Sequence, residues 1–366
     1  MKLAIAHDFV RHGGAEKVLE QMHALWPTAP VYTLLAEDNP QYRDWDIRSS
    51  RLQGWLPPSK YRWPLPFYPG MVDRLPQRID WDIDLLISSS VSLMKNLRVP
   101  AHIPHLCCIY RPAMFAYDRQ DEFLAGYPAV FRPLLRNFSA KFRSWDQAGS
   151  NNPDLYVACS KYVASKVKEY YRQQAKVVYP PVETAAFCEA GKKTERGDYY
   201  LTALRLESYK RAETVVEACT RLKLPLKVAG TGPMRRELEN IAGPSVEFLG
   251  FVPGTEMPAL VAGCRTFLFP SEEDFGIAPV EALAAGRPVI AYGAAGALET
   301  VSDGETGIHY PHQSTDALVQ AIQREQEVDW DEERLRASAE RFSTENFRTR
   351  FHQTVESLLA DWKPPA

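Results

Sequence analysis

The sequence predicts an α/β protein with two doubly wound domains, each built on a parallel sheet. The chain has 366 residues, more than the roughly 250–300 at which a single hydrophobic core stops growing. Short β-rich apolar runs alternate with helical patterns, which is typical of βαβ units. A polar stretch near the middle, Glu189–Gly197, separates two such series. Two domains on one chain imply an interface, so we expect a cleft.

Composition excludes several classes of protein. Hydrophobic residues make up 45% of the chain and charged residues 24%, which is ordinary for a globular protein and rules out disordered or collagen-like chains. No apolar run approaches the roughly 20 residues of a membrane-spanning helix, and the N-terminus does not resemble a signal peptide, so we expect a cytoplasmic protein. Six cysteines without a C-x-x-C pair fit neither a disulfide framework nor a zinc site, and we expect core residues.

The formal net charge of −3 conceals a difference between the two halves. Residues 1–185 carry 23 Lys and Arg against 18 Asp and Glu, whereas the remainder is acidic. A mildly basic first half suits a phosphate or a membrane surface, and ordinary scatter of surface charge explains it equally well. The sequence lacks the dense Lys and Arg clusters of nucleic-acid binders.

The first domain is expected at residues 1–182. Its predicted strands are Leu3–His7, Leu85–Ser88, His105–Ile109, Leu155–Cys159 and one in the stretch Val177–Val182 that ends at the proline pair Pro180-Pro181. Gly13-Gly14 opens a helix with apolar residues at helical spacing, and a second helix is predicted from Lys161 to Tyr171.

The second domain is expected at residues 183–344. Its predicted strands, each followed by a helical segment, are Tyr199–Ala203, Leu226–Ala229, Val246–Leu249, Thr266–Phe269 and Val289–Ala291. The final helices, from about Asp331 to Trp362, are amphipathic, and we expect the last of them, about 345–366, to pack back on the first domain.

Proline and aromatic residues concentrate in Trp55–Pro58 and Tyr61–Pro69. Such a segment is neither a regular helix nor a central strand, so it is predicted to be a loop with large apolar side chains. A loop pinned onto its own domain is the simpler interpretation, and a surface that touches an acceptor or lipid headgroups is the functional one.

The most informative segment is Ser271–Ile290, which follows the predicted strand Thr266–Phe269. Pro279 is tolerated only in the first turn of a helix and Gly286 suits the position after its end, so a short helix is predicted from Gly276 to Ala285. Its N-terminus lies at the carboxyl end of a parallel strand, where open α/β sheets bind ligands and free backbone N–H groups attract anions.

Two glutamates eight positions apart belong to this segment. Glu273 lies in the loop, and Glu281 lies one to two turns into the helix. Taken alone, both are explained by solvated surface charge. Glu281 is surrounded by apolar residues, however, and an unpaired carboxylate there is costly. We therefore expect Glu281 to have a hydrogen-bond partner, for which a pair of ligand hydroxyls is a good candidate.

This element, with Phe275, Gly276 and Ile277 between its glutamates, resembles that of the retaining glycosyltransferases of family 4. Those enzymes have the GT-B fold, two Rossmann-like domains facing each other across a cleft, and transfer a sugar from a nucleotide sugar. Three further elements resemble the family in chain order: His7-Asp8 with Gly13-Gly14-Ala15-Glu16, Arg205 with Lys210, and Gly293–Gly307. The resemblance covers nearly the whole chain and is strongest over 199–310.

The resemblance implies a donor site in the second domain. Arg205 and Lys210 are expected to hold the diphosphate, Glu281 the ribose, and Glu273 with the backbone of Phe275–Ile277 the sugar. A planar guanidinium fork, a point charge and a helix N-terminus can stabilise a departing diphosphate without a metal, so we expect neither metal nor cofactor. Arg205, Lys210 and Glu273 are the expected catalytic residues.

Two glycine turns are weaker signals. Gly13 and Gly14 open a helix after the first strand, so their N–H groups could face the same diphosphate across the cleft, although a lone glycine pair is usually only a turn. Gly230-Thr231-Gly232-Pro233 lacks the third glycine of a dinucleotide fingerprint and is interpreted as a tight turn that lines the nucleotide pocket.

The sequence departs from the family at one place. Many members carry a histidine that approaches the transferred sugar, and Tyr110 stands at the aligned position here, followed by Arg111. No catalytic histidine is therefore carried over, although front-face transfer in which the leaving phosphate deprotonates the acceptor does not require one. Tyr110 and Arg111 are weak acceptor-side candidates, and packing of the cleft wall explains both equally well. His7, at the end of a cleft-facing strand, is a weak alternative.

The prediction is a retaining, metal-independent hexosyltransferase that acts on a glycan or lipid-linked acceptor in the synthesis of surface polysaccharide or glycoconjugate. GDP-mannose is the leading donor because the relatives that look most similar make mannose-containing polysaccharides. Peripheral contact with the inner face of the membrane stays open. A nucleotide-sugar epimerase and a non-catalytic nucleotide-sugar-binding protein are the alternatives, and a nicotinamide-dependent dehydrogenase is poorly supported.

Overall fold

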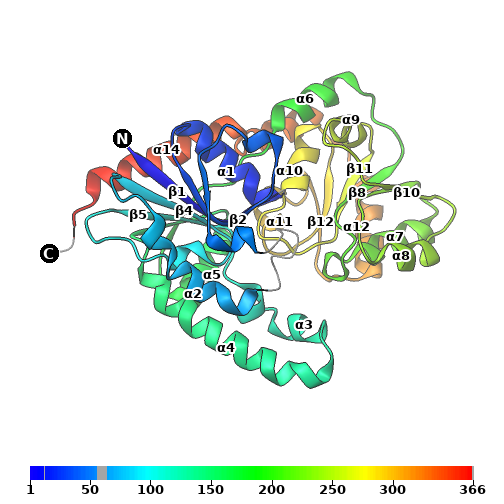
Figure 1. The fold of residues 1–366 in the computed structure, drawn as a ribbon. Helices are drawn as coiled ribbons and strands as arrows, with labels where there is room; N and C mark the ends of the chain where they lie inside the picture. The colour runs from blue at the N-terminus through cyan, green and yellow to red at the C-terminus, as the bar shows by residue number, and fades with distance from the viewer. Residues whose placement is uncertain (12, 56–63, 365–366) are drawn as a thin grey trace. The chain divides into compact units, whose positions relative to one another are not determined.

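A computed structural model describes residues 1–11, 13–55 and 64–364 and divides the chain into two compact units (Figure 1). Unit 1 comprises Met1–Tyr179 together with the C-terminal segment from Arg348, and unit 2 comprises Pro180–Phe347. The sequence analysis placed these two boundaries at 182 and 344. Residues 56–63, which include part of the predicted aromatic loop, lie outside the described residues.

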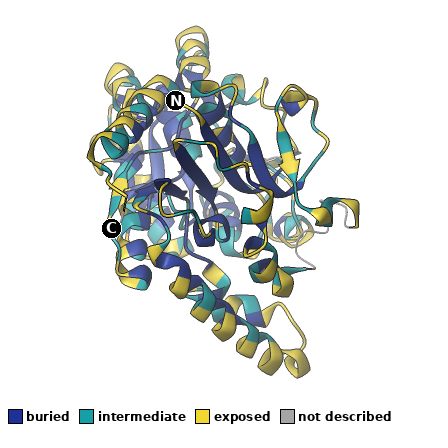
Figure 2. Ribbon diagram, turned by 60° about the vertical axis from the view of Figure 1, so that its left-hand side comes forward, coloured by how far each residue is buried: buried dark blue, intermediate teal, exposed yellow. Residues whose placement is uncertain are grey.

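Unit 1 contains a parallel sheet with the strand order β3-β2-β1-β4-β5-β6-β7. Its strands are β1 (Leu3–Val10), β2 (Val31–Ala36), β3 (Ile47–Ser49), β4 (Leu85–Ser90), β5 (His105–Ile109), β6 (Leu155–Ala158) and β7 (Ala175–Val177). The central strands β1, β4 and β5 are almost wholly buried, as expected for strands with helices on both faces. Figure 2 shows these strands as the buried centre of the unit.

Four of the five strands predicted for the first domain are confirmed, and β2 and β3 were missed. The strand predicted from Val177 to the proline pair lies earlier than expected, because β7 ends at Val177, and Val182 makes only an isolated bridge to Ser343. Pro180 and Pro181 interrupt that stretch and have no N–H group to donate to a strand ladder.

The helices of unit 1 are α1 (Gly14–Leu25), α2 (Tyr68–Val72), α3 (Gln120–Ala125), α4 (Arg132–Ala148) and α5 (Lys161–Tyr171). The prediction for α5 is confirmed, and its start follows from the Ser160 hydroxyl, which accepts a hydrogen bond from the N–H of Val163 at 3.0 Å. Helix α14 (Thr344–Asp361) begins in unit 2 and ends in unit 1, where Arg348 Nε donates to Gln21 Oε1 at 2.9 Å and Phe351 packs edge-on against Trp26.

Unit 2 contains a second parallel sheet, with the order β10-β9-β8-β11-β12-β13. The strands are β8 (Tyr200–Ala203), β9 (Leu226–Ala229), β10 (Val246–Gly250), β11 (Thr266–Phe269), β12 (Val289–Tyr292) and β13 (Gly307–Tyr310). The helices are α6 (Thr184–Lys193), α7 (Ala212–Leu222), α8 (Arg235–Ile241), α9 (Met257–Ala262), α10 (Ile277–Ala284), α11 (Ala297–Thr300), α12 (Thr315–Gln326) and α13 (Glu332–Glu340). The five predicted strands are confirmed, and β13 was missed. The predicted linker Glu189–Gly197 is partly helical, because α6 extends to Lys193.

The cysteines lie in the interior, as their pattern in the sequence predicted. Five of the six cysteines are buried and Cys188 is half-buried, and burial raises the pKa of the Cys107 thiol to about 12. These cysteines are packing residues, as predicted. In the described part of the chain, no helix has the length and apolar character needed to cross a membrane.

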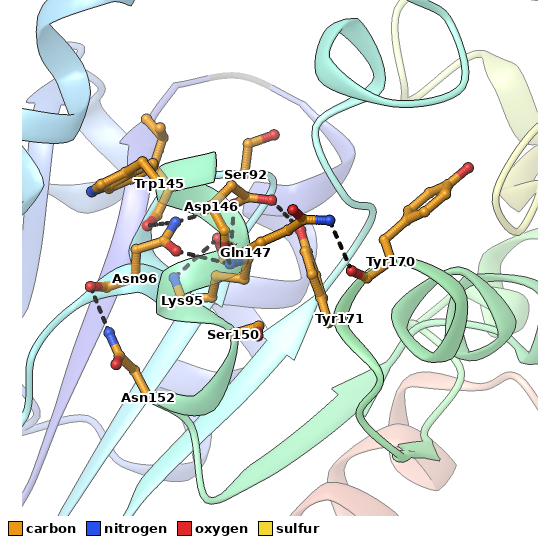
Figure 3. Close-up of polar contacts among 12 residues, drawn as sticks. Ser92, Lys95, Asn96, Trp145, Asp146, Gln147, Ser150, Asn152, Tyr170 and Tyr171 are labelled. Carbon is orange, nitrogen blue, oxygen red and sulfur yellow. Dashed lines mark hydrogen bonds and ion pairs between the residues drawn. The ribbon is translucent and has the colours of Figure 1, made fainter. Parts of the chain in front are cut away.

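A buried ion pair joins two parts of unit 1 that are distant in sequence (Figure 3). Lys95 Nζ lies 3.0 Å from Asp146 Oδ1, and neither side chain is exposed to solvent. Asp146 Oδ2 also accepts hydrogen bonds from Tyr117 and Tyr171, at 2.8 and 2.7 Å, and Asn96 donates to Oδ1 at 3.2 Å. Burial lowers the pKa of Lys95, while Asp146 opposes that shift. The pair therefore fixes the C-terminal turn of α4 to the loop after β4.

Breaking this pair should be costly. We expect Asp146→Asn and Lys95→Met each to lower the free energy of unfolding by about 3–5 kcal/mol, because either change leaves its partner buried without a countercharge. The double variant should lose less than the sum, since it buries no charge. Asp46→Asn, which removes a half-exposed ion pair with Arg48, is the control, and a loss of about 0–1 kcal/mol is expected. Denaturant titration measures the free energy of unfolding of all four variants. If the double variant lost as much as the two single variants together, the two residues would not be energetically coupled.

The stability of unit 1 should depend on pH through His105. This side chain is buried on β5 with Nε2 2.7 Å from Ser88 Oγ, and burial lowers its pKa from 6.5 to about 3. Below pH 6.5 the unfolded chain binds a proton that the folded chain does not, so stability falls as the pH drops from 6.5 toward 3. We expect His105 to account for about 2 kcal/mol of destabilisation at pH 5. Denaturant titrations of the wild type and His105→Gln at pH 7 and pH 5 isolate this share, and equal pH dependence in the two proteins would refute it.

Candidate functional site

The predicted donor residues of unit 2 lie in loops at one edge of its sheet. Arg205 and Lys210 follow β8, and Glu273 follows β11, the neighbouring strand. The turn after β9 and the segment after β12 flank them on either side. Because all these strands are parallel, their carboxyl ends meet at the same edge, which is where open α/β sheets bind ligands. The topology therefore brings four separate motifs together.

A short helical turn, Ser208–Lys210, positions the two predicted cations after β8. Arg205 is exposed, and its Nη2 donates to the hydroxyl of Tyr209 at 3.0 Å. The Nζ of Lys210 lies 5.2 Å from the centre of the Tyr209 ring, a cation–π distance. Tyr209 thus contacts both cations and limits the freedom of their side chains.

Lys210 and Glu273 are in direct contact. The distance from Lys210 Nζ to Glu273 Oε1 is 2.6 Å, and the side chains are 12% and 30% exposed. Ser271 strengthens the junction, because its Oγ donates to the carbonyl of Lys210 at 3.1 Å. Two residues assigned separate roles from the sequence, one for the diphosphate and one for the sugar, therefore form one ion pair that joins the loops after β8 and β11.

The short predicted helix is confirmed as α10, with Gly276 at its N-cap. Gly276 has φ 89°, a left-handed conformation that favours glycine, and this turn brings the chain from the loop into the helix. Phe275 is buried and packs edge-on against Phe342, with ring centres 5.3 Å apart. Ile277 and Glu281 are half-buried on α10. The backbone N–H groups of the first turn are thus held at the same edge as Lys210.

Two glycine contacts that sequence reasoning missed support these loops. A Cβ on Gly232 would lie 2.4 Å from the carbonyl oxygen of Leu206, so the Gly230–Pro233 turn packs directly on the backbone beside Arg205. Gly296 approaches Phe275 equally closely, with a Cβ position 2.3 Å from the Phe275 Cα, and its N–H donates to the carbonyl of Glu273 at 2.9 Å. The glycines indicated turns in the sequence, but the backbone that each of them contacts lies more than 20 residues away along the chain, so the contacts could not be predicted.

The predicted residues of unit 1 also meet at the carboxyl edge of its sheet. Tyr110 follows β5, and its hydroxyl lies 2.7 Å from Ser89 Oγ and 3.4 Å from the carbonyl of Ala15, next to Gly14. Ser89 Oγ is in turn 2.9 Å from His7 Nδ1. Burial raises the pKa of Tyr110 well above its ordinary value, so its hydroxyl stays protonated. Tyr110 is a neutral hydrogen-bonding group here, unsuited to act as a base.

The Gly13-Gly14 turn carries its own carboxylate. Gly13 is the N-cap of α1, and a Cβ there would lie 2.7 Å from Glu16 Oε2. Burial acts to raise the pKa of Glu16, but its contacts with His7, 4.0 Å away, with the backbone and with Arg11 together outweigh burial, and the pKa lies below its usual value. An ionised carboxylate therefore occupies the positive end of the α1 dipole, the position at which the sequence analysis expected a phosphate.

Asp8 was quoted only as part of a motif, yet it organises the loop after β4. Its buried carboxylate accepts hydrogen bonds from four consecutive backbone N–H groups, those of residues 91–94, at 2.7–3.1 Å. Burial raises its pKa, although the charge of His7 and the bonds from residues 92–94 oppose the shift. Lys95 follows this loop at once, so Asp8 and the buried Lys95–Asp146 pair hold the same segment.

Arg111 is buried and pairs with Asp118, with Nη2 2.7 Å from Oδ2. The charge of this acceptor-side candidate is thus offset within unit 1. Across the described ranges of the chain, no three His, Cys, Asp or Glu side chains gather in a way that could hold a metal ion. A cavity of about 270 Å³ beside Arg98, Asn152 and Trp362 lies at the amino ends of β5 and β6, away from the candidate site.

Comparison with known proteins finds similarity mainly in the second unit. Residues 198–325 match the family described as Glycosyl transferases group 1. An uncharacterized glycosyltransferase of Methanocaldococcus jannaschii is 25% identical over 202 residues, 53% of this chain and 56% of that protein. A GDP-mannose-dependent phosphatidylinositol monomannoside mannosyltransferase of Mycobacterium tuberculosis is 29% identical over 198 residues, 46% of this chain and 51% of that protein. The chain thus spans about half the length of these relatives.

Solved structures extend the likeness in fold to the whole chain. HepE of Anabaena in complex with UDP aligns over 98% of this chain and 100% of its own, with a TM-score of 0.70 and 18% identity. Sucrose-phosphate synthase of Thermosynechococcus elongatus aligns over 99% and 100%, with a TM-score of 0.73 and 18% identity. The two parallel-sheet units are accordingly Rossmann-like domains of the GT-B type, and residues 198–325 are similar to the group 1 glycosyl transferases.

Proposed function

We propose that this chain is a retaining glycosyltransferase that moves a hexose, mannose in the first instance, from a nucleotide sugar to a glycan or lipid-linked acceptor. The observation that carries the proposal is the junction of Lys210 with Glu273 at the carboxyl ends of β8 and β11. It lies within the segment that matches the group 1 glycosyl transferases, and it combines a cation for a diphosphate with a carboxylate for sugar hydroxyls.

In this proposal Arg205 and Lys210 bind the diphosphate and stabilise the negative charge that it gains as the sugar departs. These side-chain cations take the part that a metal ion plays in other transferases, so the reaction requires none. Glu281 binds the ribose, and Glu273 with the Phe275–Ile277 backbone binds the sugar. Because Lys210 is already paired with Glu273, an arriving phosphate shares the lysine with the carboxylate, which holds Nζ in place beforehand.

Unit 1 is proposed to bind the acceptor through Tyr110. A protonated Tyr110 offers a hydrogen bond but cannot accept the acceptor's proton, so that proton goes to the departing phosphate. Glu16 already occupies the N-terminus of α1. The negative charge of Glu16 repels a phosphate at this end of the helix, so in the proposal the diphosphate binds Arg205 and Lys210. Gly13 and Gly14 contribute at most a contact with a ligand hydroxyl. The Asp118 carboxylate limits Arg111 to a structural part in the same way.

The identity of the donor is the least constrained element. Mannose is supported by two relatives, the mycobacterial enzyme and an O-antigen chain mannosyltransferase of Escherichia coli that is 34% identical over 117 residues. Those 117 residues are 31% of this chain and 29% of that protein. The HepE structure contains UDP, so the base is a separate question. A thermal-shift screen of GDP, UDP and ADP answers it, because a ligand that binds only the folded state raises the melting temperature.

The reaction itself is tested by incubating the chain with GDP-mannose, UDP-glucose and other nucleotide sugars, with and without candidate acceptors. Release of nucleoside diphosphate that depends on acceptor, with a product of unchanged anomeric configuration, is the expected result. Binding without release or transfer would instead support a non-catalytic nucleotide-sugar-binding protein, and conversion of the donor sugar itself would support an epimerase.

Lys210→Ala should lower kcat/KM by about 30- to 1,000-fold, or roughly 2–4 kcal/mol, because it removes a preorganised charge contact to the departing diphosphate. Lys192→Ala is the matched control, since Lys192 is an exposed lysine of unit 2 on α6. Steady-state rates of diphosphate release measure both. Unchanged turnover in Lys210→Ala would mean that the diphosphate binds elsewhere.

Gly296→Ala should disturb donor binding by displacing the loop that carries Glu273, because the new methyl group would overlap the backbone of Phe275. Gly254→Ala in the same unit is the control, since a Cβ there has no atom within 4 Å. We expect the nucleotide-induced rise in melting temperature to shrink only in Gly296→Ala. If the nucleotide raised the melting temperature of Gly296→Ala as much as that of the wild type, donor binding would not depend on this loop.

A further inference from the structure

A helical arm extends from unit 1 and exposes an apolar tip. Helices α3 and α4, which pack against each other, form the arm along the lower edge of Figure 1. The stretch from Ala125 to Leu134, between the two helices and into the first turn of α4, is exposed at every residue. Figure 2 shows the outer part of the arm as its exposed end. This stretch, residues 125–134, is called the arm tip below.

The side chains of the arm tip are unusually apolar for a solvent-facing surface. Tyr127 is 43% exposed, Val130 78%, Phe131 53% and Leu134 68%. Single exposed apolar residues are normal on a soluble protein, but four large ones within eight positions indicate a surface that binds something. Trp55 and Phe67 are also exposed in unit 1, in segments adjoining the undescribed residues 56–63, and they provide a comparison.

Beside the arm tip α4 carries only cations, whereas α3 carries Asp121 and Glu122, and Arg136 Nη2 lies 3.9 Å from Asp121 Oδ1 with both side chains exposed. From Phe123 to Trp145 the chain contains four cations, Arg132, Arg136, Lys141 and Arg143, and no Asp or Glu. Arg132 is committed to the tip itself, because its Nε donates to the carbonyl of Tyr127 at 3.0 Å. Arg136 and Lys141 are exposed further along α4. An apolar tip with cations beside it complements a surface that is apolar inside and anionic at its boundary.

The base of the arm is anchored to the core. Phe115, Phe138 and Phe142 stack between α4 and the turn before α3, with ring centres 4.8–6.1 Å apart. The Lys95–Asp146 pair then fixes the last turn of α4, as Figure 3 shows. An exposed tip on a well-anchored helix stays exposed, because the arm cannot fold back to bury its apolar residues.

We propose that the arm tip is a docking surface for an anionic lipid membrane. Phe131, Leu134, Val130 and Tyr127 insert at the level of the headgroups, where aromatic and aliphatic side chains are favoured. Arg136 and Lys141 contact lipid phosphates while their aliphatic stems lie along the apolar boundary. The docking does not depend on the proposed sugar transfer. It moves the membrane contact considered in the sequence analysis from the aromatic loop to α3 and α4.

Co-flotation of the full chain with vesicles tests the docking without donor or acceptor. Wild type should float with vesicles of phosphatidylcholine and about one third phosphatidylglycerol, weakly with phosphatidylcholine alone, and less at high salt. Phe131→Ser with Leu134→Ser, and separately Arg136→Gln with Lys141→Gln, should each weaken binding to the anionic vesicles by about tenfold or more. All four side chains are exposed, so the melting temperature should stay unchanged.

Two matched controls should retain wild-type binding. Trp55→Ser with Phe67→Ser removes two exposed apolar side chains elsewhere in unit 1, and Arg74→Gln with Lys176→Gln removes two exposed cations there. The nucleotide-induced thermal shift should be the same in all variants, so a defect in donor binding is recognised separately. Loss of vesicle binding in the Trp55 and Phe67 variant, with the arm variants unaffected, would overturn the proposal.

Sedimentation in solution tests whether a second copy of the chain, and not a membrane, covers the arm tip. If the wild-type protein floats with neither kind of vesicle, the proposal is overturned. If that protein is also a dimer, and Phe131→Ser with Leu134→Ser makes it a monomer, the arm tip is covered by a second copy of the chain. A monomer that binds anionic vesicles through the arm tip supports the proposal.

Discussion

Both units depend on one geometric constraint, which is that neighbouring strands of a parallel sheet end at the same edge. In unit 2, β8 and β11 are paired in register from Tyr200 and Thr266, so the loops that follow them emerge side by side, and Lys210 reaches Glu273 within 2.6 Å. In unit 1, the adjacency of β1, β4 and β5 produces the contacts of His7 with Ser89 and of Ser89 with Tyr110. Polar groups scattered along the chain become neighbours because the sheet order makes their strands neighbours.

Buried charged side chains restrict the local conformation of unit 1. Removing a carboxylate from water is unfavourable unless its oxygens are satisfied, and each buried carboxylate here is satisfied by groups from elsewhere in the unit. Asp8 uses the backbone of residues 91–94, whereas Asp146 uses Lys95 and two tyrosine hydroxyls. Both sets of bonds meet on one segment after β4. That segment has few alternative conformations, because any other would leave a charge buried without partners.

The sequence was most informative where structure is local. Helix α5 has its Ser160 cap and α10 its proline and glycine punctuation, and short apolar runs marked the inner strands correctly. Strand β3 is short, but β2 and β13 are at least as long as strands that were recognised, and the strand before the proline pair was placed two residues too late. The roles predicted for the motifs of unit 2 came from their resemblance to a family, because their spacing alone is explained equally well by surface charge. The Lys210–Glu273 pair, the Asp8 contacts and the Lys95–Asp146 pair could not be predicted, since each joins residues whose distance depends on sheet order or on the packing of α4.

The path of α14 has a consequence for how the protein is made. Because this helix begins at Thr344 and then packs against Gln21 on α1 and Trp26 at its C-terminal end, the chain of unit 1 is interrupted by the whole of unit 2. A ribosome therefore delivers every residue of unit 2 before the last helix of unit 1 emerges. Unit 2 can complete its core during synthesis, whereas the surface around Gln21 and Trp26 stays uncovered until α14 has been translated. Nascent chains should thus gain their protease resistance in two stages, with the second domain in sequence closing first.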